Sequence, residues 1–280
     1  MDTDQDLKLI KLYAPVEKIP LSKLLNNDPP KGKEYVILDT KSKAMLSFCS
    51  KEYKLRKNSS IYKAFEKLLD KNKIKFKRKI TIVGNTKFYV SYIIIDRIKS
   101  LSITDMLPKI CIWNSYDGTI KTQIRFGYYK ILCGNTLSRP GECSLTTGSK
   151  HNDLEFTKDN MPYFFSLLKK FLKEIPKDMK VFEKLYKIPV LEKNINSVIS
   201  KINLSLEAKK VSIEHFKKEI KGEYTYKNEL GDTISHEGSE QNMFTLYNSI
   251  NYSIYNTNLK ELPDKKQYRD FKLVSLLLSI

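Results

Sequence analysis

A change in the period of the apolar residues near residue 150 constrains the fold of this chain more than any other feature. Residues 71–80 show the two-residue period of strands, and β-branched and aromatic runs separated by turn residues continue to about residue 133. From about residue 158, apolar residues recur at spacings of three and four, which is the helical period. Strands followed by helices predict an α+β protein, in which an antiparallel sheet from the first half is packed by helices from the second half.

Turn signals and prolines divide the chain into expected elements. Gly84-Asn85 and Asp117-Gly118 each separate two β-rich runs. The expected strands are residues 80–83, 87–98, 110–113 and 119–133, and the expected helices are 60–69, 161–175, 179–186, 191–202, 207–220, 241–255 and 268–280. We therefore expect a basic β-rich region at 1–150 and a helical region at 151–280, in one continuous domain.

Positive charge is concentrated in one stretch of the chain. The 280 residues carry 50 Lys and Arg against 32 Asp and Glu, a formal net charge of +18. Residues 51–100 alone hold 15 Lys and Arg against 4 Asp and Glu, a net of +11. This asymmetry favours a binding surface for a polyanion. The alternative is a general bias towards Lys and Asn that has no binding role.

A run of alternating lysines forms the centre of the basic stretch. Lys73, Lys75, Lys77 and Lys79 alternate with apolar residues, so a strand here would project four lysines from one face. Neighbouring lysines would lie about 6.6 Å apart, twice the rise of ~3.3 Å per residue, which suits the phosphates of an extended nucleic-acid strand. The alternative is a solvated edge strand whose lysines prevent aggregation.

Basic and aromatic residues also interleave further along the sheet region, around Tyr128. Such a pattern can supply phosphate contacts and base-stacking platforms, although packing is the commoner role of strand tyrosines. The expected nucleic-acid-binding residues are Lys71, Lys73, Lys75, Lys77, Arg78, Lys79, Arg97, Arg125, Tyr128, Lys130 and Arg139.

The sequence favours a binding protein over an enzyme. It holds neither a P-loop motif nor a G-x-G-x-x-G, so we expect no nucleotide cofactor. Cys133, Cys143 and His151 lack the short spacing of zinc ligands, and the acidic residues around His236 lie in a polar segment where solvation explains them. We therefore assign no catalytic residue and no metal ligand.

The apolar runs and the cysteines of the sequence bear on the cellular compartment. The longest apolar runs are far shorter than the roughly 20 residues that span a bilayer, and no secretory signal is evident. Cys49, Cys111, Cys133 and Cys143 are irregularly spaced, which is typical of reduced thiols. We expect a cytoplasmic protein without disulfides and without a membrane partner.

A series of short motifs resembles a known family. The motifs are an N-S-x-D-G turn at residues 114–118, Arg125, C-x-N-T-L at residues 133–137, His151, and T-x-Y-N at residues 245–248. In this order they resemble the phage/plasmid-like family called domain of unknown function 932. The resemblance implies residence on mobile elements and names no activity.

Asn114, Asn135 and His151 form a second candidate site within these motifs. They could converge with Arg125 on a phosphate or a base edge at the end of the sheet. The alternative is a structural role, in which asparagine side chains satisfy loop backbone groups.

We expect a protein of a mobile element that binds single-stranded nucleic acid, DNA before RNA. Its expected role is ATP-independent strand annealing in recombination, or strand protection, as a homo-oligomer in the host cytoplasm. Two alternatives stay open: a non-enzymatic inhibitor of a host defence protein, and a metal-dependent nuclease.

Overall fold

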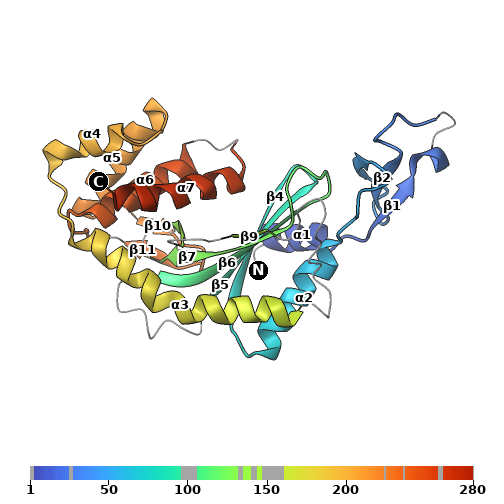
Figure 1. Ribbon diagram of the computed structural model, residues 1–280, viewed down its shortest axis with the longest axis horizontal. Coiled ribbons are helices and arrows are strands. Elements are labelled where there is room, and N and C mark those ends of the chain that lie inside the picture. The colour runs from blue at the N-terminus through green and yellow to red at the C-terminus, as the bar shows by residue number, and fades with distance from the viewer. Residues whose placement is uncertain are drawn as a thin grey trace. The chain divides into compact units, whose positions relative to one another are not determined.

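A computed structural model gives the fold of the chain (Figure 1). It describes residues 3–24, 28–95, 106–131, 135–139, 144–146, 161–223, 225–235, 237–257 and 261–279. The chain divides into two compact units, each drawn from three segments. Unit 1 comprises residues 1–92, 111–125 and 144–168, and unit 2 comprises residues 93–110, 126–143 and 169–280.

Strands of both units belong to a six-stranded sheet with the order β4-β5-β6-β7-β8, in which β9 also pairs with β7. The pairings of β7 with β8 and with β9 are antiparallel. The strands are β4 (Phe76–Val83), β5 (Lys87–Ile94), β6 (Met106–Ser115), β7 (Gln123–Lys130), β8 (Thr136–Ser138) and β9 (Ser144–Thr146). Strand β4 therefore forms one edge of this sheet.

Unit 1 adds a small antiparallel sheet and two helices to its part of the large sheet. The small sheet has the order β1-β2-β3. These elements are α1 (Thr3–Leu12), β1 (Val16–Pro20), the short helix η1 (Leu21–Lys23), β2 (Tyr35–Asp39), β3 (Met45–Cys49) and α2 (Asn58–Lys71).

Helix α2 covers one face of the large sheet within unit 1. Its apolar residues fall at helical spacing, so Ile61, Phe65 and Leu69 are all buried on one side. The ring of Phe65 lies 5.1 Å from the ring of Tyr92 on β5. On the opposite side of α2, Lys63 and Lys67 are exposed.

Unit 2 packs long helices against its part of the large sheet. These helices are α3 (Met161–Lys187), α4 (Glu192–Ser200), α5 (Leu206–Lys221), α6 (Met243–Asn256) and α7 (Pro263–Leu277). The first residues of α3 belong to unit 1. A hairpin of β10 (Thr225–Lys227) and β11 (Thr233–Ser235) lies between α5 and α6 in sequence. Helix α6 contacts both α5 and α7 (Figure 1).

The two faces of the sheet in unit 2 carry different cores. On one face, the ring of Phe171 from α3 lies 4.9 Å from the ring of Phe126 on β7. On the other face, Ile93, Leu107 and Tyr129 form a buried cluster, against which residues including Leu230 of the β10–β11 turn pack. Helices cover the first face and the hairpin contributes to the second.

The predicted α+β class is confirmed, with the sheet of the first half packed by later helices. The predicted break at Pro176 is wrong, because α3 continues through it. Ile175 and Met179 are buried on either side of this proline, so packing holds the helix together where one backbone hydrogen bond is missing. The two compact units interleave along the chain.

Two further expectations concern thiols and membranes. Cys49 and Cys111 are free thiols, and Cys133 and Cys143 lie outside the described residues. No helix in the described part of the chain is long and apolar enough to cross a bilayer.

Candidate nucleic-acid interface

Five exposed lysines follow one another at every second position where α2 passes into β4. We call Lys71, Lys73, Lys75, Lys77 and Lys79 the lysine row. Lys71 ends α2, and the next two lysines lie in the turn before β4 begins at Phe76. Lys77 and Lys79 belong to β4 itself. The alternation that the sequence predicted is therefore present, although the strand begins later than expected.

The turn that carries the row has a defined backbone. Lys73 adopts a left-handed conformation, with φ of 53°, and its N–H donates to the carbonyl of Asp70 at 2.9 Å. The N–H of Ile74 donates to the carbonyl of Leu69 at 3.0 Å, and Ile74 is buried. These bonds fix the direction in which the chain leaves α2 and enters β4.

Arg78 does not belong to the row, which corrects the prediction for this residue. Its guanidinium donates to Glu66 of α2 at 2.7 Å, so the side chain lies on the face of β4 that α2 covers. Burial lowers the pKa of Arg78, but the hydrogen bond and charge of Glu66 raise it overall. Since side chains alternate along a strand, Lys77 and Lys79 project from the other face.

Helix α1 occupies the backbone at one position of this edge strand. The side-chain oxygen of Gln5 accepts from the N–H of Ile80 at 2.9 Å, and its amide nitrogen donates to the Ile80 carbonyl at 3.4 Å. The glutamine thus satisfies backbone groups that a neighbouring strand would otherwise pair. Residues of α1 also line a small pocket with Phe76 and Arg78.

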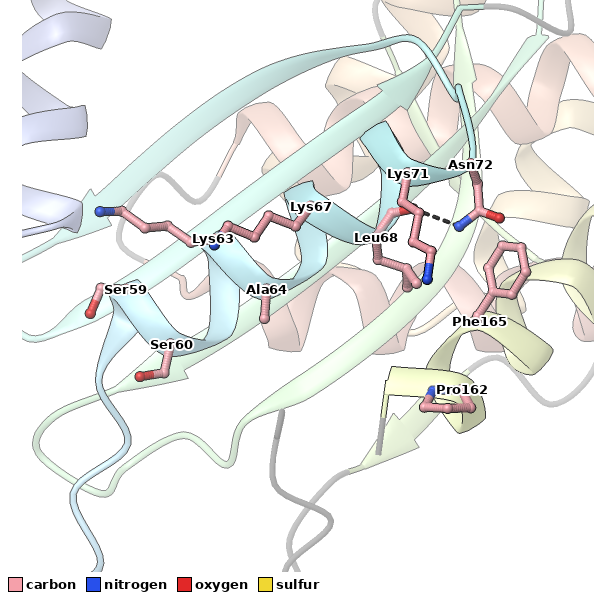
Figure 2. A pocket seen from close by; sticks show the side chains of 10 residues that line it. All are labelled: Ser59, Ser60, Lys63, Ala64, Lys67, Leu68, Lys71, Asn72, Pro162 and Phe165. Atoms are coloured by element: carbon pink, nitrogen blue, oxygen red, sulfur yellow. Dashed lines mark hydrogen bonds between the residues drawn. The ribbon is translucent and has the colours of Figure 1, made fainter. Parts of the chain in front are cut away.

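A groove lies beside Lys71 on the solvent side of α2 (Figure 2). Its volume is about 850 Å³, and the described residues that line it belong to unit 1. Three lysines share it at four-residue spacing, so they follow one face of the helix at a rise of about 6 Å each. The described lining contains no Asp or Glu: it is Ser59, Ser60, Lys63, Ala64, Lys67, Leu68, Lys71, Asn72, Pro162 and Phe165.

Tyr128 is not a stacking platform, which corrects a second prediction. It is fully buried, and its hydroxyl donates to Asp178 at 2.6 Å. Its ring lies 5.7 Å from Phe171 and 5.8 Å from Phe182, both on α3. The strand alternation that places Tyr128 on one face is real, but that face is the one that the helices cover.

Lys130 and Arg139 are also engaged inside unit 2. Lys130 is 4% exposed and pairs with Glu219 at 3.5 Å. Arg139 pairs with Asp178 at 2.6 Å and with Glu174. Both cations are therefore neutralised by carboxylates of the helices, and we remove them from the candidate interface.

Arg125 lies in unit 1 and is half-buried. Its guanidinium lies over the ring of Trp113 on β6, 4.5 Å from the ring centre, and bonds to the side chain of Gln123. Arg97 and His151 lie outside the described residues, so the structure places neither of them.

Asn114 and Asn135 have protein partners rather than a shared ligand site. Asn114, in unit 1, is 2% exposed; it donates to Asn58 at 2.8 Å and accepts from Thr122 at 2.8 Å. Asn135, in unit 2, donates to the side chain of Asn248 at 2.8 Å. These contacts fit the structural interpretation of both asparagines.

Sequence reasoning missed a buried polar network around Glu219 in unit 2. Glu219 is completely buried, and it accepts hydrogen bonds from Asn248 at 2.6 Å and from Ser249 at 3.0 Å. Burial raises the pKa of Glu219, but the charge of Lys130 and the neighbouring donors lower it overall. The T-x-Y-N motif was the available signal, because it contains Asn248.

Asp270 is a second buried carboxylate of unit 2. Asp270 of α7 accepts from the hydroxyl of Tyr247 at 2.8 Å and from the backbone N–H of Ser138 on β8. Burial raises the pKa of Asp270 above its usual range. Both Tyr247 and Asn248 of the motif thus serve contacts that hold α6 to its neighbours.

Within the described residues, no group of three or more His, Cys, Asp or Glu is arranged to hold a metal ion.

Comparison with known proteins places the chain in a family. Searches of curated proteins and of solved structures give no significant match. The family described as Domain of unknown function (DUF932) matches residues 45–270, a span that includes both the lysine row and the buried network. The chain therefore belongs to the DUF932 family.

Proposed function

We propose that this protein binds single-stranded nucleic acid, DNA before RNA, through the lysine row of unit 1. The observation that carries the proposal is the exposure of all five lysines of the row, while Ile74 and Ile80 between and beyond them are buried. Exposed ammonium groups that follow one another along a turn and an edge strand can contact phosphates of an extended strand without reading its sequence. The net charge of +18 adds long-range attraction for a polyanion.

Protection of the sheet edge is the competing explanation of the row. Lysines on an edge strand discourage pairing with other chains. In this protein, however, Gln5 already occupies the backbone of Ile80 on the edge strand. Edge protection therefore accounts for the lysines less well than it would on an uncovered strand.

The role that we propose is strand annealing in recombination, or strand protection, on a mobile element in the host cytoplasm. Neither role needs a nucleotide cofactor, because base pairing supplies the free energy of annealing. We further propose that several copies assemble, since this would join short lysine rows into a longer binding path. No described contact favours the two alternative functions, inhibition of a host protein and metal-dependent nuclease activity.

The test uses a variant in which Lys73, Lys75, Lys77 and Lys79 become Gln. Each lost phosphate contact on a single strand lowers the slope of log K against log salt by about 0.7, so the slope should fall by up to about 2.8. A matched control removes four exposed lysines of unit 2, by changing Lys177, Lys180, Lys184 and Lys187 to Gln. Fluorescence anisotropy with a labelled oligonucleotide measures both variants.

The two variants separate a site from a general charge effect. We expect a large loss of affinity, and of the slope of log K against log salt, in the variant of the lysine row, and a small loss in the control. Equal losses in both variants would show that net charge, not the lysine row, drives binding. Circular dichroism checks that both variants keep their helices, as exposed lysines contribute little to stability.

A further inference from the structure

The groove beside Lys71 has the chemistry of a subsite for one nucleotide. Its lysines supply positive charge, and its other lining includes the apolar side chains of Ala64, Leu68, Pro162 and Phe165. Its volume of about 850 Å³ falls within the roughly 300–1,000 Å³ of small-molecule sites. Figure 2 shows Phe165 of α3 beside the end of α2, where Lys71 and Asn72 stand.

The charges around the groove favour an anion. Glu66, the acidic residue nearest in sequence to Lys63 and Lys67, points to the other side of α2 and is paired with Arg78. Lys63 also lies over the ring of Tyr13, 5.0 Å from its centre. No described carboxylate lines the groove, so its lysines have no acidic partner inside it that a phosphate would have to displace.

We propose that the groove takes one unpaired base of the bound strand, stacked on Phe165, while Lys67 and Lys71 contact the flanking phosphates. The inference rests on the proposed function and deepens it, because Lys71 belongs both to the lysine row and to the groove. A base in a duplex is already stacked and paired, so it cannot enter without the cost of unpairing. The subsite would therefore select single strands over duplexes.

The test compares two labelled strands of about 30 nucleotides, one of oligothymidine and one whose residues all lack a base. Phe165→Leu keeps an apolar side chain and removes the ring. A stacked base is worth about 1–3 kcal/mol, so this variant should bind oligothymidine about 5- to 150-fold more weakly and the abasic strand with unchanged affinity. Lys67→Gln with Lys71→Gln should weaken binding of both strands.

Tyr163→Ala is the matched control for the loss of a ring. Tyr163 lies on the same turn of α3 and is 42% exposed, but it does not line the groove. It should leave the affinity for both strands unchanged. The same affinity of Phe165→Leu and the unaltered protein for oligothymidine would overturn the subsite, as would an equal loss on the abasic strand.

The outcomes keep the two proposals apart. Binding of both strands with no effect of Phe165→Leu refutes the subsite and leaves the lysine row in place. Failure of the unaltered protein to bind either strand at low salt refutes both proposals. If circular dichroism shows that Phe165→Leu unfolds, the variant Lys67→Gln with Lys71→Gln replaces it. An equal loss of affinity for the single strand and the duplex in that variant would contradict selection by the groove.

Discussion

Replacing Lys130 with Met tests whether the buried network of unit 2 is held together by charge. The methionine keeps an unbranched apolar chain next to the ring of Phe244, over which the ammonium lies at 5.0 Å. It removes the cation that faces Glu219 at 3.5 Å. The carboxylate then retains its hydrogen bonds from Asn248 and Ser249 and its contact with His215 Nδ1 at 3.5 Å, but it loses its lysine partner.

Removing one partner of a buried ion pair costs about 3–5 kcal/mol, because the other charge is left uncompensated. Lys130 is 4% exposed and Glu219 is 0% exposed, so the full range applies here. We expect Lys130→Met to lower the free energy of unfolding at pH 7 by this amount. Lys217→Met on the same helix as Glu219, at an exposed position, should change it by less than about 0.5 kcal/mol.

The loss should depend on pH with a definite sign. In the unaltered protein the pKa of Glu219 is lowered, so its contribution to stability is present above the unfolded pKa and is lost as the pH falls. The charge of Lys130 is the largest of the effects that lower this pKa, so we expect the pKa of Glu219 to rise in Lys130→Met and the stabilisation by its ionised form to shrink. The difference between the two proteins should therefore be smaller near pH 4 than at pH 7.

Urea unfolding followed by circular dichroism at 222 nm measures this difference, since the long helices of unit 2 dominate the signal. The double variant Lys130→Met with Glu219→Gln should recover part of the loss, because it no longer buries an unpaired charge. A cost below about 1 kcal/mol at pH 7, or one that does not change with pH, would refute an ionised Glu219 in the folded protein.

Three further substitutions test single contacts by urea unfolding. Gly127→Ala should cost about 1–3 kcal/mol, because the new Cβ would stand 2.5 Å from the carbonyl oxygen of Leu137 and force β8 to move. Tyr128→Phe removes the bond to Asp178 and should cost about 1.5–3 kcal/mol while leaving nucleic-acid binding unchanged; lost binding with full stability would contradict its placement. Burial raises the pKa of Asp117, but hydrogen bonds from lysine and threonine side chains lower it far below its usual range. The protein should therefore lose stability as the pH falls below about 4, and Asp117→Asn should make that loss smaller.

The fold could be predicted where the sequence carries a clear period. The two-residue alternation around β4 correctly predicted which lysines are exposed, and the helical spacing in α5 and α6 gave those helices nearly to their ends. The β10–β11 hairpin was missed, because its strands are only three residues long and lie in a polar segment. A period needs several repeats before it can be recognised.

The site residues were predicted less well, for a physical reason. Alternation separates the two faces of a strand but does not say which face a distant helix covers. Lys130 meets Glu219 across 89 positions of sequence, and Asn135 meets Asn248 across 113. Such contacts depend on the tertiary packing of unit 2, so Lys130 of β7, which resembled part of a binding surface, is in fact buried.

Nucleic-acid binding by the unaltered protein tests whether the lysine row is a binding site. Fluorescence anisotropy should be recorded with a labelled single strand of about 30 nucleotides and with its duplex, over a series of salt concentrations. We expect tighter binding of the single strand, with an affinity that falls steeply as salt is added. No binding at low salt, or binding that salt does not weaken, would rule out the lysine row as a nucleic-acid site.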